Sequence, residues 1–154
     1  MKGGVLLALA FLVAGCTPKV HVDYDTGADF SRLRSYDWLP SPAPPAEAPS
    51  YSDRTLMERR VRSSADAALQ ARDYLPARAQ PDFQLNSFFV LTPGYYDPEE
   101  VVTLVIDVVD PRSNVLLWRG TRATGLHRSD TAEERDMRID TAVRAILNRF
   151  PPQP

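Results

Sequence analysis

The chain has 154 residues, with 18 Lys and Arg against 20 Asp and Glu, a formal charge of -2, 44% apolar residues and one cysteine. This size and composition predict one globular domain and exclude a disordered chain or a polytopic membrane protein. The charge balance provides no broad basic surface, so we expect no nucleic-acid partner. One cysteine excludes an internal disulfide and a multi-cysteine metal cluster.

The N-terminal segment has the features of a secretion signal. Lys2 supplies a short positive region, residues 5–13 form an apolar run, and two small residues precede Cys16. At about 1.5 Å rise per residue, this run spans only about half of a ~30 Å hydrocarbon core, which is too short for a membrane span. Residues 1–15 are therefore predicted to be a signal peptide.

The sequence Leu-Val-Ala-Gly-Cys at residues 12–16 resembles the lipobox of bacterial lipoproteins. The resemblance implies that Cys16 is acylated and becomes the first residue of the mature protein; the alternative is an ordinary buried thiol. Residues 16–19 would then be the lipidated cysteine and a short tether. Two or more acyl chains anchor a protein stably to a membrane. Because Thr17 follows the cysteine, resemblance to Gram-negative lipoproteins favours the outer membrane, facing the periplasm, over the inner membrane.

Five segments have the alternating or β-branched composition that is typical of strands. They are residues 20–25, 34–39, 82–91, 101–109 and 115–124. Between the second and third of these segments, residues 40–50 contain five prolines and predict an extended surface loop.

Two segments have apolar residues at helical spacing. The first is residues 53–72. The second begins at a capping box formed by Thr131 and Glu134, ends before Pro151, and carries one apolar face. That face consists of Ile139, Val143, Ile146 and Phe150.

The resulting order, ββαβββα, predicts an α+β fold. Its two layers would be a mainly antiparallel sheet and two helices that cover one face of this sheet. Residues 20–154 then form a single domain, with the proline-rich loop 40–50 at its surface.

Short motifs along the chain carry a family resemblance. They are Asp23-Tyr24-Asp25, Asp29-Phe30-Ser31, Tyr36-Asp37-Trp38, Pro81-Asp82-Phe83, Leu104-Val105-Ile106-Asp107, Leu117-Trp118-Arg119-Gly120 and the ending from Ala142 to Pro152. Taken together they resemble the bacterial lipoproteins with a DUF4136 domain, and the likeness covers nearly the whole mature chain. The resemblance implies a lipidated N-terminus but no known activity.

The residue types that bind metals are present but poorly spaced. Residues 23–29 imitate the start of a calcium loop, but the twelfth position, which requires Glu, holds Arg34. A strand edge in which an Asp caps a turn is the alternative that we favour. His21 and His127 are far apart and lack metal-binding spacing, so we expect surface positions for both. No metal and no cofactor are predicted.

The constellations needed for catalysis are also incomplete. No Gly-x-Ser-x-Gly motif or glycine-rich phosphate loop is present, and the only cysteine belongs to the predicted anchor. Two carboxylate pairs remain, Asp107 with Asp110 and Glu99 with Glu100. Neighbours on a strand face opposite ways, and pairs at turns are usually hydrated. We therefore predict that the protein is not an enzyme.

Three residues are candidates for binding a partner. Tyr95 and Tyr96 lie in a polar loop, where amphipathic aromatic rings suit a partner surface or the bilayer interface; the alternative is packing over the sheet edge. Arg119 follows Trp118, and it would contribute by stacking or pairing beside an exposed indole. In the alternative, Trp118 is core, Arg119 points outward and Gly120 relieves crowding.

The expected function is that of a membrane-anchored, periplasm-facing lipoprotein without enzymatic activity. It would be anchored through its acyl chains and would bind an envelope protein or glycolipid. A second hypothesis, drawn by analogy from architecture, is a lipid or glycolipid handling or assembly factor, which needs an apolar cleft between helices and sheet. The third, an envelope hydrolase, needs His, Asp and Ser to converge in one pocket.

Overall fold

The structure is a computed structural model and describes residues 18–40, 53–92, 101–127 and 129–153. The predicted signal peptide, Cys16, nearly all of the proline-rich loop, Tyr95, Tyr96 and the Glu99–Glu100 pair lie outside these residues. Within the described part of the chain, no helix is long and apolar enough to cross a membrane.

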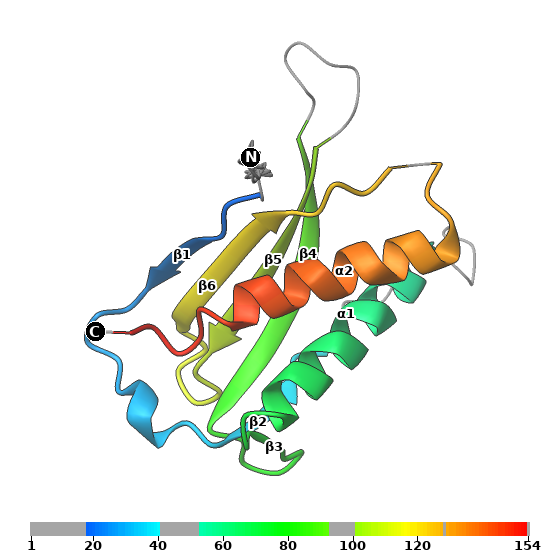
Figure 1. The fold of residues 1–154 in the computed structure, drawn as a ribbon. Helices are drawn as coiled ribbons and strands as arrows, with labels where there is room; N and C mark the ends of the chain where they lie inside the picture. The colour runs from blue at the N-terminus through cyan, green and yellow to red at the C-terminus, as the bar shows by residue number, and fades with distance from the viewer. Residues whose placement is uncertain (1–17, 41–52, 93–100, 128, 154) are drawn as a thin grey trace, which may run out of the picture.

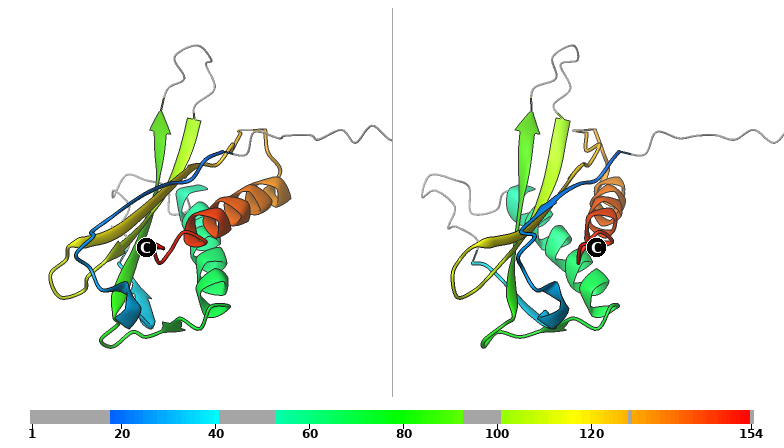
Figure 2. Two further views of the ribbon diagram at one scale, coloured as in Figure 1. Left: turned by 60° about the vertical axis from the view of Figure 1, so that its left-hand side comes forward. Right: turned by 90° about the vertical axis from the view of Figure 1, so that its left-hand side faces the viewer.

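The described residues form one sheet and two long helices (Figure 1). In chain order the elements are β1 (His21–Tyr24), the 3-10 helix η1 (Phe30–Arg32), β2 (Ser35–Trp38), α1 (Asp53–Gln70), β3 (Leu75–Pro76), β4 (Phe83–Thr92), β5 (Val101–Val109), β6 (Leu116–Ala123) and α2 (Ala132–Leu147). Both helices lie on the same side of the sheet (Figure 2). The predicted α+β class, with two helices and a mostly antiparallel sheet, is confirmed.

The strands lie in the order β1-β6-β5-β4-β2-β3. The pairs β1·β6, β6·β5 and β5·β4 are antiparallel, whereas β2 runs parallel to both β4 and β3. The first strand in the sequence, β1, therefore forms one edge of the sheet, whereas the second, β2, lies next to the opposite edge. Parallel neighbours need a crossover connection, which is commonly helical, and α1 lies between β2 and β4 in the sequence.

The helices begin as predicted and end earlier. Thr131 accepts a hydrogen bond from the Glu134 N–H, and the Glu134 carboxylate accepts one from the Thr131 N–H, so the capping box is confirmed. Helix α1 ends at Gln70 rather than at residue 72. There Asp73 has a positive φ of 65° and the Tyr74 N–H donates to the Leu69 carbonyl, a geometry that commonly ends helices.

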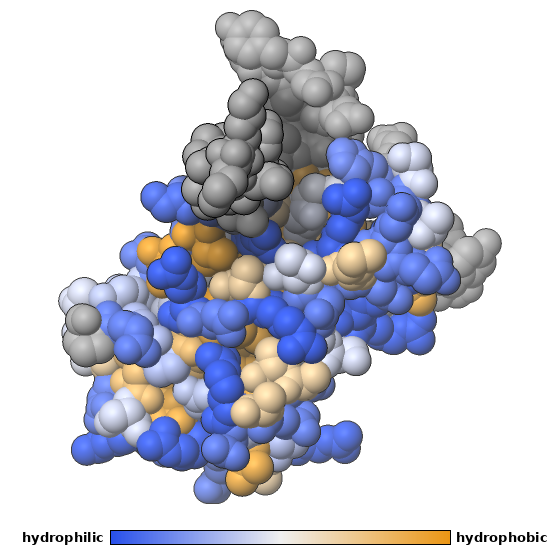
Figure 3. All heavy atoms as spheres, viewed as in Figure 1, coloured by the Kyte–Doolittle hydropathy of each residue, from blue (hydrophilic) through white to orange (hydrophobic). Residues whose placement is uncertain are grey.

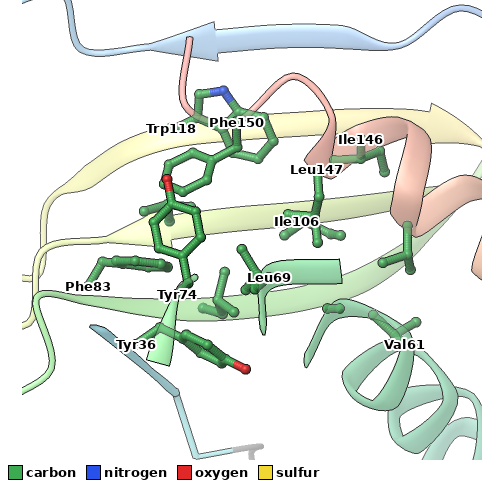
Figure 4. Packing of buried hydrophobic residues seen from close by; sticks show 14 of the residues in the cluster. Tyr36, Val61, Leu69, Tyr74, Phe83, Ile106, Trp118, Ile146, Leu147 and Phe150 are labelled. Carbon is green, nitrogen blue, oxygen red and sulfur yellow. The ribbon is translucent and has the colours of Figure 1, made fainter. Parts of the chain in front are cut away.

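The core lies between the helices and the sheet (Figure 4). Its largest fully buried side chains are Trp118, Tyr36, Phe83, Phe150, Leu69, Leu85, Leu104, Ile106, Ile139, Ile146, Leu147 and Val61. Phe150 lies beyond the end of α2, so its predicted place on the helix is wrong, although it faces the same core. Figure 3 shows that the helix side of the surface is largely hydrophilic, with small separate apolar patches.

Candidate functional site

The sheet face opposite the helices carries a row of polar side chains. The strand register places Asp23 of β1 beside Arg119 of β6, Arg119 beside Asp107 of β5, and Asp107 beside Asn86 of β4. Side chains alternate between the two faces of a strand, so these residues point away from the helices that cover Trp118 and its neighbours. We refer to this face, centred on Arg119, as the open sheet face.

Arg119 and Asp107 form a bidentate ion pair at the centre of this face. Nε donates to Oδ1 at 2.7 Å and Nη2 donates to Oδ2 at 2.8 Å. The Asp107 side chain is 6% exposed, whereas that of Arg119 is 42% exposed. The hydrogen bonds to Asp107, together with the charges of Asp107 and Asp23, raise the pKa of Arg119. The guanidinium also lies 5.8 Å from the ring centre of Phe88. Arg119 thus neutralises a buried carboxylate and still exposes part of its cation to solvent.

The environment of Arg119 decides between the two interpretations of its segment. Trp118 is fully buried, and a Cβ on Gly120 would lie 2.4 Å from the Trp118 ring and 2.5 Å from Ile146. The interpretation in which Arg119 acts beside an exposed indole is therefore wrong. The alternative, a core tryptophan with a glycine where a helix approaches, is confirmed.

Asp107 and Asp110, the described pair that we weighed for acid–base chemistry and did not favour, have separate structural roles. Asp107 is held by Arg119, and the Oδ1 atom of Asp110 accepts the N–H groups of Arg112 and Ser113 in the turn between β5 and β6. These turn hydrogen bonds lower the pKa of Asp110. The two carboxylates are thus engaged by different groups.

A polar hollow of about 380 Å³ lies at one end of the sheet. It is lined by Asp25, Ala28, Asp29, Phe30, Arg32, Leu33, Pro81, Asp82, Asp110, Pro111, Arg112 and Leu117. Hydrogen bonds from the Arg34 and Ser35 N–H groups lower the pKa of Asp82, and bonds from Ser31 lower that of Asp29. These carboxylates therefore remain charged at neutral pH. Asp29 is engaged by its own turn, whereas Asp82 accepts hydrogen bonds from the backbone at the start of β2. No group of three or more potential metal-binding side chains is found within the described ranges.

The calcium-like segment and the histidines behave as turn and surface residues. Asp25 accepts the Gly27 N–H at 2.8 Å, and Asp29 caps η1 by accepting the Ser31 N–H at 3.1 Å. The prediction that an Asp of this segment caps a turn is confirmed. His21 and His127 are both exposed, as predicted for surface positions.

Sequence reasoning missed Arg122, which is only 9% exposed. Its Nε donates to the Pro18 carbonyl at 3.2 Å, and its Nη1 donates to the Thr141 carbonyl of α2 at 3.0 Å. A signal was present, because alternation along β6 places Arg122 on the same face as Trp118 and Gly120. An arginine at such a position must find hydrogen-bond acceptors within the protein.

Together these observations define a small two-layer domain with one helix-covered and one open sheet face. The chain belongs to the DUF4136 family: the model of the "Domain of unknown function (DUF4136)" matches residues 20–152. A comparison with curated proteins finds no match.

Two of the solved structures that match this chain illustrate the shared fold. One is a PDZ domain protein from Parabacteroides distasonis, with a TM-score of 0.63 and 12% identity over 88% of this chain. This chain covers only 36% of that protein. The other is the PelC dodecamer from Paraburkholderia phytofirmans, with a TM-score of 0.52, 14% identity, and coverage of 90% of this chain and 100% of that chain. At these identities the likeness shows the fold alone.

Proposed function

We propose that this protein is a lipid-anchored lipoprotein of the outer membrane, facing the periplasm, whose domain binds an envelope partner and does not catalyse a reaction. The lipobox-like sequence ending at Cys16 supports the anchor. The observation that carries the binding role is the open sheet face, where Arg119 keeps an exposed cation above a buried carboxylate.

The chemistry of the open sheet face suits a protein partner. Arginine and aromatic residues are enriched in protein interfaces, and here Arg119 lies beside Phe88. Val90, two residues further along β4 on the same face, is 40% exposed. The apolar side chains of Phe88 and Val90 would contribute buried area in a complex with a folded partner. The fixed cation of Arg119 would determine the orientation of that partner. The assembly of the PelC protein as a dodecamer adds a second copy of the chain to the candidate partners.

The observations favour neither of the other two functions. A lipid-handling protein needs an apolar cleft between helices and sheet, but side chains such as Trp118, Ile106 and Leu147 fill that space. The hollow at the end of the sheet is polar instead. A hydrolase needs a nucleophile and a base in one pocket, and neither of the two exposed histidines lines this hollow.

The anchor is tested by Cys16→Ser. We expect the wild-type protein in the detergent-soluble membrane fraction and the variant as an unprocessed precursor, because the acyl acceptor has been removed. Fractionation and mass spectrometry of the N-terminal peptide provide the measurement. Thr17→Ala is the control and should be processed and acylated normally. Unchanged processing of Cys16→Ser would refute lipidation.

The binding role is tested by affinity capture from native envelopes in mild detergent. Thr121→Glu adds a negative charge on the open sheet face near Arg119, whereas Met137→Glu adds the same group on exposed α2. We expect a stoichiometric protein partner with wild type and Met137→Glu. With Thr121→Glu, recovery should fall about tenfold, which corresponds to roughly 1.4 kcal/mol of binding free energy.

Other outcomes of the capture experiment would contradict parts of the proposal. Equal recovery with both glutamate variants would place binding away from the open sheet face. A specific glycolipid without a protein would support the lipid-handling function instead. Turnover of a defined substrate by the purified protein would overturn the non-enzymatic role.

A further inference from the structure

The N-terminal segment is attached to the domain from Pro18 onward. The Pro18 carbonyl accepts a hydrogen bond from Arg122, Val20 packs against the core, and β1 begins at His21. Cys16 is two residues before Pro18. Two residue steps reach at most about 7 Å, so the proposed acylated residue must lie close to this point of the domain.

Arg122 holds this exit point between two other elements. It lies on the helix-facing side of β6, and its guanidinium joins the Pro18 carbonyl to the Thr141 carbonyl of α2. Burying a guanidinium is costly unless hydrogen bonds within the protein replace its hydration. The geometry that satisfies Arg122 therefore also determines where the chain leaves the domain.

Several strand ends meet at the exit point. The register pairs His21 with Thr121 near the end of β6, Ala123 with Thr103 near the start of β5, and Thr103 with Val90 near the end of β4. Figure 1 shows the start of β1 and these strand ends at the same end of the molecule. We call it the tether end.

The polar hollow lies at the opposite end of the sheet. Its lining residues Asp110 and Arg112 follow β5, which runs away from the tether end. A nine-residue strand such as β5 is about 30 Å long at 3.3 Å per residue.

We propose that the tether end rests on the lipid bilayer with the strands directed away from it, and that Arg122 is the positioning residue for this orientation. The proposal rests on the acylation of Cys16 described above. It follows that the hollow points away from the bilayer, toward the periplasm. The sheet then stands upright on the membrane, and its open face points sideways, where a membrane-bound partner can reach it.

The orientation is measured on the lipidated full-length protein in vesicles of phosphatidylethanolamine and phosphatidylglycerol that contain an acceptor dye on the lipid headgroups. Acylation consumes the thiol of Cys16, so His21→Cys or Val115→Cys introduces a unique labelling site at an exposed position. The two sites lie ~20 Å apart along the strands, because Thr121, the partner of His21, is six residues from Val115. We expect strong energy transfer from the label at 21 and several-fold weaker transfer from the label at 115.

The role of Arg122 is tested by repeating the measurement with Arg122→Lys, since an ammonium group cannot bridge the two carbonyls as the guanidinium fork does. Arg72→Lys is the matched control. Arg72 donates to the carbonyls of Leu147, the last residue of α2, and of Phe150 beyond it, but its hydrogen bonds do not reach the tether. Both variants should lower stability. Only Arg122→Lys should reduce the difference in transfer between the two labels.

The outcomes separate the orientation from the anchor. Equal transfer from both labels in the vesicle-bound wild type, or stronger transfer from 115, overturns the proposed orientation while leaving the anchor intact. An unchanged difference in Arg122→Lys overturns the positioning role. An unmodified Cys16, detected by mass spectrometry, overturns the anchor and the orientation together.

Discussion

Replacing Gly120 by alanine should destabilise the domain by about 1–3 kcal/mol, the usual cost of overpacking a core. The added Cβ would lie 2.4 Å from Cη2 of Trp118 and 2.5 Å from Cγ2 of Ile146. Both side chains are fully buried, so neither can move without displacing further core residues. The measurement is chemical denaturation followed by tryptophan fluorescence.

The control for Gly120 is Gly27→Ala. There the nearest atom to the added Cβ is the Asp25 carboxylate oxygen at 3.3 Å, on an exposed side chain that can adjust. We expect a change within about 0.5 kcal/mol, as for other surface substitutions. Equal losses at the two glycines would show that α2 does not pack against β6 as closely as described.

Phe150→Ala should have a larger effect, a loss of about 3–5 kcal/mol in the free energy of unfolding. The Phe150 ring is 1% exposed and lies at the centre of the aromatic cluster. Its centroid is 5.4 Å from those of Phe83 and Trp118 and 5.8 Å from that of Tyr74. Alanine would leave a cavity, because the surrounding residues belong to different segments of the chain and can relax into the space only in part.

Phe150→Leu keeps most of the side-chain volume and serves as the matched control. It should cost less than about 1.5 kcal/mol in the same denaturation measurement. If alanine and leucine were equally destabilising, the loss would come from the backbone beyond α2, whose Phe150 carbonyl bonds Arg72, rather than from the ring.

Local patterns in the sequence predicted the elements well because each depends on nearby residues. The capping box of Thr131 and Glu134 spans one helical turn. The alternation in β6 distinguishes the buried Trp118 from the outward Arg119. Such amphipathic segments favour two helices packed on one sheet face, so the α+β class could be predicted from the sequence.

The pairing of distant strands could not be predicted. Alternation shows which side chains of a strand face the core, but not which strand lies next to it. Nothing near β1 indicates that it pairs with β6 rather than with β2. The two residues of β3 are too few to show a period. Phe150 matched the helical spacing of Ile146, but the chain leaves the helix before it.

The candidate site was predictable to a similar extent. The outward direction of Arg119 follows from its position in β6, but its bidentate partner Asp107 lies on another strand, and only the register brings the two together. The alternation of β6 also gives the inward direction of Arg122. Its acceptors could not be predicted, because the carbonyls of Pro18 and Thr141 are main-chain groups that no side-chain pattern reveals.

The pairing of β1 with β6 has a consequence for the order of folding. The partners His21 and Thr121 are about a hundred residues apart, so a chain synthesised from its N-terminus presents β1 long before its partner strand exists. Contacts of such high sequence separation form slowly. The strand nearest the proposed anchor would thus join the sheet only after nearly the whole domain has emerged. Its four residues include His21 and Asp23, and a short edge strand with polar residues limits misassociation during this interval.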